Sequence, residues 1–204
     1  MTGNAPRLLL FDLGGVLVDV SGYRHLGSLL KASLHEAEVL QQLRACPVLF
    51  AFETGQLGAV QFAEQFVAAW ECKVAADEFL RQFRSWTYGF FPGARELLAG
   101  LHGRYRLACL SNSNEAHWER MEKELGCFDY FDAALSSHLL RCYKPDPEIY
   151  RRAFSTLRVE PQTVIFFDDL EANVEGAKAA GAQAYRVKGI AELRKRLEEL
   201  KLLA

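Results

Sequence analysis

The sequence predicts an α/β fold: a Rossmann-like parallel sheet with helices on both faces, joined to a small helical cap domain. Short apolar runs of strand length recur along the chain, and stretches with helical periodicity separate them. One longer helical stretch interrupts this alternation near its start. Strands that alternate with helices form parallel sheets, because a right-handed crossover returns the chain to the same end of the sheet.

The composition is that of an ordinary globular protein. With 204 residues, 50% of them hydrophobic, the chain is long enough for one substantial core and a small accessory module. A net charge of -2 with dispersed Lys and Arg gives no large basic field, so we expect no nucleic-acid partner. No apolar run approaches the roughly 18 to 20 residues of a membrane span, and residues 1–7 lack a signal-peptide core. We therefore expect no membrane partner and a cytoplasmic location; the oligomeric state does not follow from the sequence.

The first strand is the apolar run 8–11, which ends at Asp12 ahead of two glycines. After it, apolar residues recur at spacings of three and four, as in Leu26, Leu29 and Leu30, which predicts helices. A Pro-Gly pair at 92–93 closes this insert. We therefore expect a core domain made of residues 1–19 and 91–204, with a helical cap domain of residues 20–90 over the carboxyl end of the first strand.

The rest of the chain alternates regularly. The expected elements are helix 93–102, strand 106–111, helix 115–125, strand 133–136, helix 147–157, strand 163–168, helix 171–180, strand 184–187 and a final amphipathic helix that contains Ile190, Leu193, Leu197 and Leu200. In such sheets ligands bind at the carboxyl ends of the strands. Asp12, Ser111 and Asp168 would all emerge there.

Three acidic side chains at these strand ends indicate a metal site. Asp12 follows the first strand, and Asp168 and Asp169 follow a later one. Neighbouring carboxylates repel one another unless a cation lies between them, so this set favours a hard, oxygen-binding ion such as Mg2+.

The remaining polar residues suit a phosphate. Ser111 and neighbouring backbone N–H groups can bind phosphoryl oxygens, and Lys144 supplies a compact positive charge. A free oxygen of Asp12 could then attack phosphorus and form an aspartyl-phosphate. The small-molecule partner we expect is therefore a phosphorylated substrate.

Four segments in this order resemble the motifs of the haloacid dehalogenase-like (HAD) superfamily, in particular its phosphatases with a helical cap after the first strand. The segments are Phe11 to Asp19, Leu110 to Asn112, Lys144 to Pro145, and Phe167 to Asp169 with Asn173 and Gly176. The resemblance implies that Asp12 is the nucleophile, that Ser111 and Asn112 hold the phosphoryl oxygens, and that Lys144 neutralises charge.

The resemblance also implies the ligands of Mg2+. They are Asp12, the backbone carbonyl of Gly14, and the pair Asp168 and Asp169. Within that pair, Asp169 is the expected direct ligand.

Gly14 is a departure from the pattern of most phosphatases in this superfamily, which carry a second aspartate there to protonate the leaving group. General acid-base help of this kind is typically worth about 10²- to 10⁴-fold in rate. His25, Glu53 and Glu115 remain open as substitutes. The first motif and the segment 52–55 also resemble a subgroup of sugar-phosphate phosphatases, such as those acting on glucose 1-phosphate.

We therefore expect a Mg2+-dependent phosphatase of a small phosphorylated metabolite, with a sugar phosphate favoured. Two alternatives stay open. A 2-haloacid dehalogenase has the same fold and also lacks the second aspartate, but it needs no cation beside Asp12. A binding or regulatory protein on the same scaffold would have no need of turnover.

Overall fold

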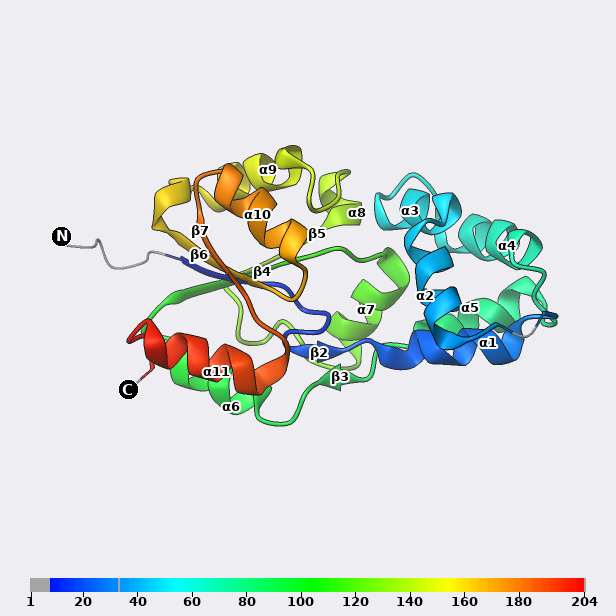
Figure 1. Cartoon of the computed structure of the whole chain (residues 1–204), viewed down its shortest axis with the longest axis horizontal. Coiled ribbons are helices and arrows are strands. Elements are labelled where there is room, and N and C mark those ends of the chain that lie inside the picture. The colour runs from blue at the N-terminus through cyan, green and yellow to red at the C-terminus, as the bar shows by residue number, and fades with distance from the viewer. Residues whose placement is uncertain (1–7, 33, 204) are drawn as a thin grey trace.

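The computed structural model describes residues 8–32 and 34–203, which form a parallel sheet and a group of helices beside it (Figure 1). The sheet has the strand order β5-β4-β1-β6-β7, and every neighbouring pair in it is parallel. Its strands are β1 (Leu8–Phe11), β4 (Arg106–Ser111), β5 (Ala133–Ser136), β6 (Val164–Asp168) and β7 (Gln183–Arg186). The α/β fold with a parallel sheet, expected from the alternation, is confirmed.

Alternate side chains of the central strand face two separate cores. Leu9 and Phe11 pack with α6 (Ala94–Leu101), α7 (Glu115–Lys123) and α11 (Gly189–Glu199). Leu8 and Leu10 pack with α9 (Pro147–Leu157) and α10 (Glu171–Ala179) on the opposite face. All four side chains are fully buried, as expected for a strand with helices on both sides. β1 is therefore held rigidly, and so is Asp12, which follows it.

A two-stranded antiparallel ribbon lies where the helical insert leaves and rejoins the core. It consists of β2 (Val18–Asp19) and β3 (Gly89–Phe90). A strand of two residues is too short to show a periodic pattern, so this pair was not predicted from the sequence. The ribbon brings the two ends of the insert together beside the first strand.

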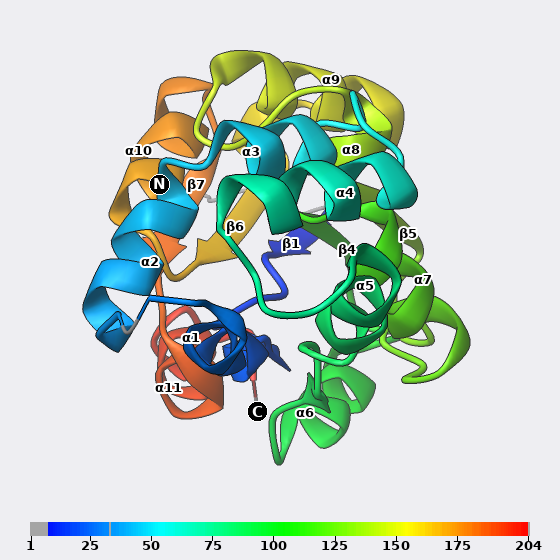
Figure 2. The same cartoon turned by 90° about the vertical axis from the view of Figure 1, so that its right-hand side faces the viewer.

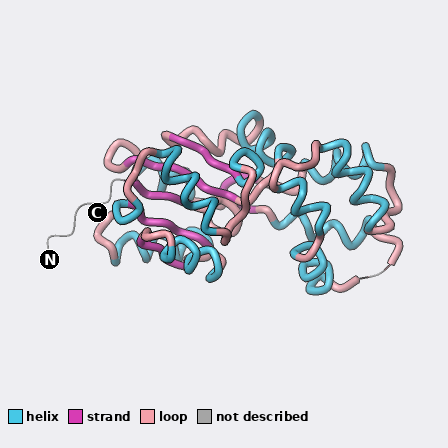
Figure 3. Tube along the Cα trace, turned by 90° about the horizontal axis from the view of Figure 1, so that it is seen from above, coloured by secondary structure: helices cyan, strands magenta, loops and turns pink. Residues whose placement is uncertain are grey.

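The insert itself is helical. Its elements are a 3-10 turn at Ser21–His25, α1 (Leu26–Leu29), α2 (Glu36–Arg44), α3 (Pro47–Glu53), α4 (Ala59–Ala69) and α5 (Ala76–Arg84). They enclose a third core rich in phenylalanine, in which the rings of Phe52 and Phe62 stack with their centroids 4.2 Å apart. Figure 2 shows these helices in front of the sheet, and Figure 3 shows the strands gathered in the other part of the molecule.

The expected core elements all form, and their ends differ from the expected ones by no more than two residues. The helix expected to reach residue 125 ends at Lys123, and the strand expected at 184–187 lies at Gln183–Arg186. A short helix after β5, α8 (Ser137–Leu140), was not predicted. Among the described residues, no helix has both the length and the apolar character that crossing a membrane would require.

Candidate active site

Asp12 and Asp168 lie side by side at the carboxyl end of the sheet. Their strands pair in register, with Phe11 opposite Phe167, and the backbone N–H of Asp12 donates to the carbonyl of Phe167 at 2.8 Å. Ser111 ends β4, the neighbour of β1 on its other side. The parallel arrangement thus brings together residues that are about a hundred positions or more from Asp12 in the chain.

The three carboxylates converge. Asp12, Asp168 and Asp169 each offer one oxygen, and these three oxygens lie within 4.8 Å of one another. Asp168 is fully buried, Asp12 is 7% exposed, and Asp169 is partly buried. Ligands of a Mg2+ ion at about 2.1 Å lie roughly 3 to 4 Å apart, so small side-chain rotations would close this set around a cation.

Lys144 is buried among two of these carboxylates. Its Nζ lies 2.6 Å from Oδ2 of Asp168 and 3.0 Å from Oδ1 of Asp12, and it also donates to the carbonyl of Leu110 at 2.9 Å. Burial acts to lower the pKa of Lys144, but the attraction of the two carboxylates is stronger and the pKa is raised overall. Lys144 is therefore a fixed positive charge at the site.

One ammonium does not neutralise three carboxylates. Burial, followed by repulsion from Asp168 and Asp169, raises the pKa of Asp12 to about 7 although Lys144 acts to lower it. Oδ1 of Asp12 is buried and receives no well-directed hydrogen bond from the described residues, since the contact with Lys144 has the distance but not the angle of one. Two uncompensated negative charges and a buried oxygen without a donor fit a divalent cation.

Asp168 and Asp169 differ in their surroundings. Both oxygens of Asp168 accept hydrogen bonds from Nδ2 of Asn173, at 2.9 and 3.1 Å, and Oδ1 also accepts from the N–H of Leu170 at 2.9 Å. With Lys144 on Oδ2 as well, the acceptor sites of Asp168 are largely filled. Among residues 8–32 and 34–203, the carboxylate of Asp169 has no comparable set of hydrogen-bond partners, which supports its expected place as the direct ligand.

The side chain of Asn112 is hydrogen-bonded to the backbone of Lys144. Its Nδ2 donates to the carbonyl of Lys144 at 3.0 Å, and its Oδ1 accepts from the N–H of Lys144 at 2.8 Å. These two bonds fix the Lys144 backbone against the loop after β4. The side chain of Asn112 therefore positions Lys144. This contact was not predicted from the sequence.

The space beside Gly14, where a carboxylate side chain would lie, is bordered by the side chain of Val20. A β-carbon built on Gly14 would lie 3.2 Å from Cγ2 of Val20, a tight contact. An acidic side chain at this position would therefore require the Val20 side chain to shift by a few tenths of an ångström.

The three open substitutes for that acid lie in different settings. The His25 ring contacts the Tyr88 hydroxyl at 2.9 Å in an exposed pair. Oε1 of Glu115 accepts from the backbone N–H of Ala59 at 2.6 Å and so joins α7 to the start of α4. Glu53 is partly buried, and burial raises its pKa to about 7 against an opposing contribution from Tyr143.

Tyr143 is a site residue that sequence reasoning missed. Burial raises the pKa of its hydroxyl, and the nearby carboxylates of Glu53 and Asp12 raise it further, while Asn112 acts to lower it. Its position just before Lys144 is the signal that could have identified it.

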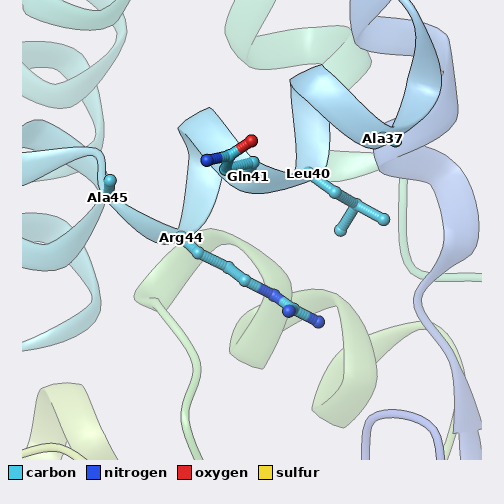
Figure 4. A pocket seen from close by; sticks show the side chains of 5 residues that line it. All are labelled: Ala37, Leu40, Gln41, Arg44 and Ala45. Carbon is cyan, nitrogen blue, oxygen red and sulfur yellow. The ribbon is translucent and has the colours of Figure 1, made fainter.

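A separate cavity of about 410 Å³ lies along α2 (Figure 4). It is lined by Ala37, Leu40, Gln41, Arg44 and Ala45. None of these residues belongs to the carboxylate cluster.

Comparison with known proteins gives consistent matches. A family model described as haloacid dehalogenase-like hydrolase matches residues 6–181. A D-ribitol-5-phosphate phosphatase of Bacteroides thetaiotaomicron is 27% identical over 200 residues, which is 93% of this chain and 95% of the relative.

Two solved structures share the fold. A HAD family enzyme of Bacteroides thetaiotaomicron, in complex with magnesium and inorganic phosphate, has a TM-score of 0.73 at 22% identity and covers 90% of this chain and 95% of its own. A protein described as a predicted HAD-like family hydrolase of Porphyromonas gingivalis has a TM-score of 0.79 at 19% identity, with 97% and 98% covered.

Proposed function

The chain belongs to the haloacid dehalogenase-like hydrolases, and on that premise we propose that it is a Mg2+-dependent phosphatase of a small phosphorylated metabolite. The observation that carries the proposal is the convergence of Asp12, Asp168 and Asp169 beside the buried Lys144. Such a set matches a divalent cation and a phosphoryl group, the two partners whose charges it complements.

In the proposed reaction, an oxygen of Asp12 attacks phosphorus while the bond to the ester oxygen breaks. The phosphoryl group is thereby transferred to Asp12 as an aspartyl-phosphate, which water then hydrolyses. Ser111 and Lys144 stabilise the negative charge on the transferred group, because a hydroxyl and an ammonium fixed in a buried site need no reorganisation. Asn112 holds Lys144 in place for this role.

The residues that would hold Mg2+ are Asp12, Asp169 and the carbonyl of Gly14, with Asp168 behind them. When bound, the ion supplies Lewis-acid stabilisation of the phosphoryl oxygens. Asp168 keeps Lys144 in position through their 2.6 Å ion pair. This division of roles follows from the hydrogen bonds that already occupy Asp168.

We propose a sugar phosphate as the substrate and residues 20–90 as a cap domain over the site. The named activity of the D-ribitol-5-phosphate phosphatase relative supports this substrate class. The insert carries its own phenylalanine-rich core, as expected of a separate unit. The proposed domain boundaries lie at the β2–β3 ribbon.

A test measures phosphate release from p-nitrophenyl phosphate and from a panel of phosphorylated sugars, nucleotides and organic acids, with Mg2+ or with EDTA. The proposal predicts Mg2+-dependent release that is fastest with sugar phosphates and is abolished in Asp12→Asn. A 2-haloacid offered in the same assay separates the dehalogenase alternative. Halide release that EDTA does not affect would contradict the proposal, and undetectable turnover of every substrate would favour a binding protein.

A further inference from the structure

We propose that Glu53, on the cap helix α3, is the general acid of this enzyme and donates a proton to the leaving group of the substrate. The inference rests on the proposed phosphatase function and extends it to the step for which position 14 offers no carboxylate. Three observations support it: the contacts of α3 with the core, the surroundings of Glu53, and the hydrogen bonds that the other candidates, Glu115 and His25, already make.

The end of α3 is docked directly on the core. Oγ of Ser137 donates to the backbone carbonyl of Glu53 at 2.5 Å, and the Arg141 guanidinium donates to the carbonyl of Gly55. Gly55 approaches so closely that a β-carbon there would lie 2.5 Å from the carbonyl oxygen of His138. The backbone of Glu53 is therefore held at a fixed place relative to the segment that follows β5.

Tyr143 relates the Glu53 side chain to the proposed phosphate site. Burial raises the pKa of Tyr143, and the Glu53 carboxylate raises it further while Asn112 acts to lower it, so both side chains are neighbours of Tyr143. Asn112 directly follows Ser111, and its amide is hydrogen-bonded to the Lys144 backbone. The exposed ring of Phe50, one turn earlier in α3, has its centroid 5.5 Å from that of the Tyr143 ring.

The environment of Glu53 suits an acid that must carry a proton at neutral pH. Burial raises the pKa of its carboxyl to about 7, with Tyr143 acting in the opposite direction. A general acid is most effective when its pKa lies near the working pH. The other candidates are less suited, because Glu115 is hydrogen-bonded to Ala59 and His25 is paired with Tyr88 at an exposed position.

An Asp12 oxygen forms a bond to phosphorus as the bond from phosphorus to the ester oxygen breaks, and the electron pair of that bond goes to the ester oxygen. The proton of Glu53 is transferred to this oxygen, so the organic product leaves as a neutral alcohol. The Glu53 carboxylate then takes a proton from the water that attacks the aspartyl-phosphate, which restores both carboxyl groups to their starting states.

The test compares Glu53→Gln with the wild type on phenyl phosphate and p-nitrophenyl phosphate, two substrates of similar shape whose leaving groups differ in basicity. Nitrophenolate leaves without a proton, whereas phenolate needs one. We expect kcat on phenyl phosphate to fall by about 10²-fold or more and kcat on p-nitrophenyl phosphate by less than about 10-fold. Glu115→Gln, the matched control at another contact between cap and core, should leave the ratio of the two rates unchanged.

A second variant keeps the test independent of folding defects. Gly14→Asp combined with Val20→Ala places a carboxylate at the usual position and removes the side chain that would obstruct it. In the Glu53→Gln background, this pair should restore the rate on phenyl phosphate more than that on p-nitrophenyl phosphate.

If Glu53→Gln lowered kcat equally on both substrates, or raised only KM, the role of Glu53 would be overturned. The proposed function would still stand in that case if Asp12→Asn abolished turnover. A wild-type protein that releases no phosphate would overturn the proposed function and this inference together.

Discussion

Gly15 and Asp169 lie in direct contact: a β-carbon added to Gly15 would be 2.7 Å from Oδ2 of Asp169. Gly15 has φ +74°, in the left-handed region that favours glycine. The loop after Asp12 thus leaves just enough space for the carboxylate that we propose as a metal ligand.

Replacing Gly15 with Ala should therefore displace Asp169 and weaken Mg2+ binding. Changes in the contacts that orient a metal ligand typically cost about 10- to 100-fold in metal affinity or activity. We expect the Mg2+ concentration for half-maximal hydrolysis of p-nitrophenyl phosphate to rise by a factor in that range.

Gly103→Ala is the control for this variant. Gly103 also has a positive φ, of +80°, but has no heavy atom within 4 Å of its added β-carbon. Its Mg2+ dependence should match the wild type. If Gly15→Ala behaved in the same way, Asp169 would not be a ligand of the metal.

Asp12→Asn should make the metal-free protein more stable. The pKa of Asp12 rises from 3.8 to about 7 on folding, so its ionised form opposes the folded state. This penalty is absent below about pH 4 and is complete above about pH 7. We expect urea unfolding at pH 8 with EDTA to show a gain of about 1–4 kcal/mol for Asp12→Asn.

The same comparison has two internal controls. At pH 4 both proteins should be about equally stable, and adding Mg2+ at pH 8 should stabilise the wild type more than Asp12→Asn. A loss of stability in Asp12→Asn at pH 8 without metal would contradict the electrostatic account of the site.

Acid should weaken the contact of His117, on α7, with Phe83, on α5 of the helical insert. The ring of His117 stacks on Phe83 with centroids 4.2 Å apart, and its Nε2 lies 2.8 Å from the Phe83 carbonyl. Burial lowers the pKa of His117 from 6.5 to about 4. The unfolded chain therefore binds a proton at a higher pH than the folded protein does, and stability falls as the pH drops from about 6.5 to 4.

This loss should amount to at most about 3 kcal/mol of unfolding free energy. His117→Gln should show a correspondingly smaller change in urea unfolding between pH 7.5 and pH 4.5. His35→Gln, at an exposed position, is the control and should keep the wild-type slope. Equal slopes in all three proteins would show that His117 does not carry the effect.

Gly55→Ala should weaken the packing of the end of α3 against the core. Gly55 has φ +67°, and its added β-carbon would meet the backbone of His138, which cannot move aside as a side chain can. Gly103→Ala shares the backbone strain but not the contact. We expect Gly55→Ala to lose about 1–3 kcal/mol more unfolding free energy than Gly103→Ala, as overpacking typically does. Equal losses would mean that this contact does not hold the cap.

The sequence predicted the sheet and the meeting of Asp12 with Asp168 because both follow directly from parallel strands, whose carboxyl ends share one edge. The place of Lys144 came from its resemblance to a motif, since no periodicity assigns a loop residue to a site. The contact of Val20 with Gly14 and the position of Glu53 beside Tyr143 could not be predicted. They depend on how the ribbon turns and how the cap docks, which are contacts between distant segments.

The central claim is that Asp12 becomes phosphorylated in a reaction that depends on a divalent cation beside it. Rapid acid quenching of the enzyme during turnover of p-nitrophenyl phosphate, followed by mass spectrometry of its peptides, tests this directly. We predict a phosphoryl group on Asp12 that forms with Mg2+ and is absent with EDTA. Rapid phosphate release during which Asp12 is never modified, or persistent turnover in Asp12→Asn, would contradict the account.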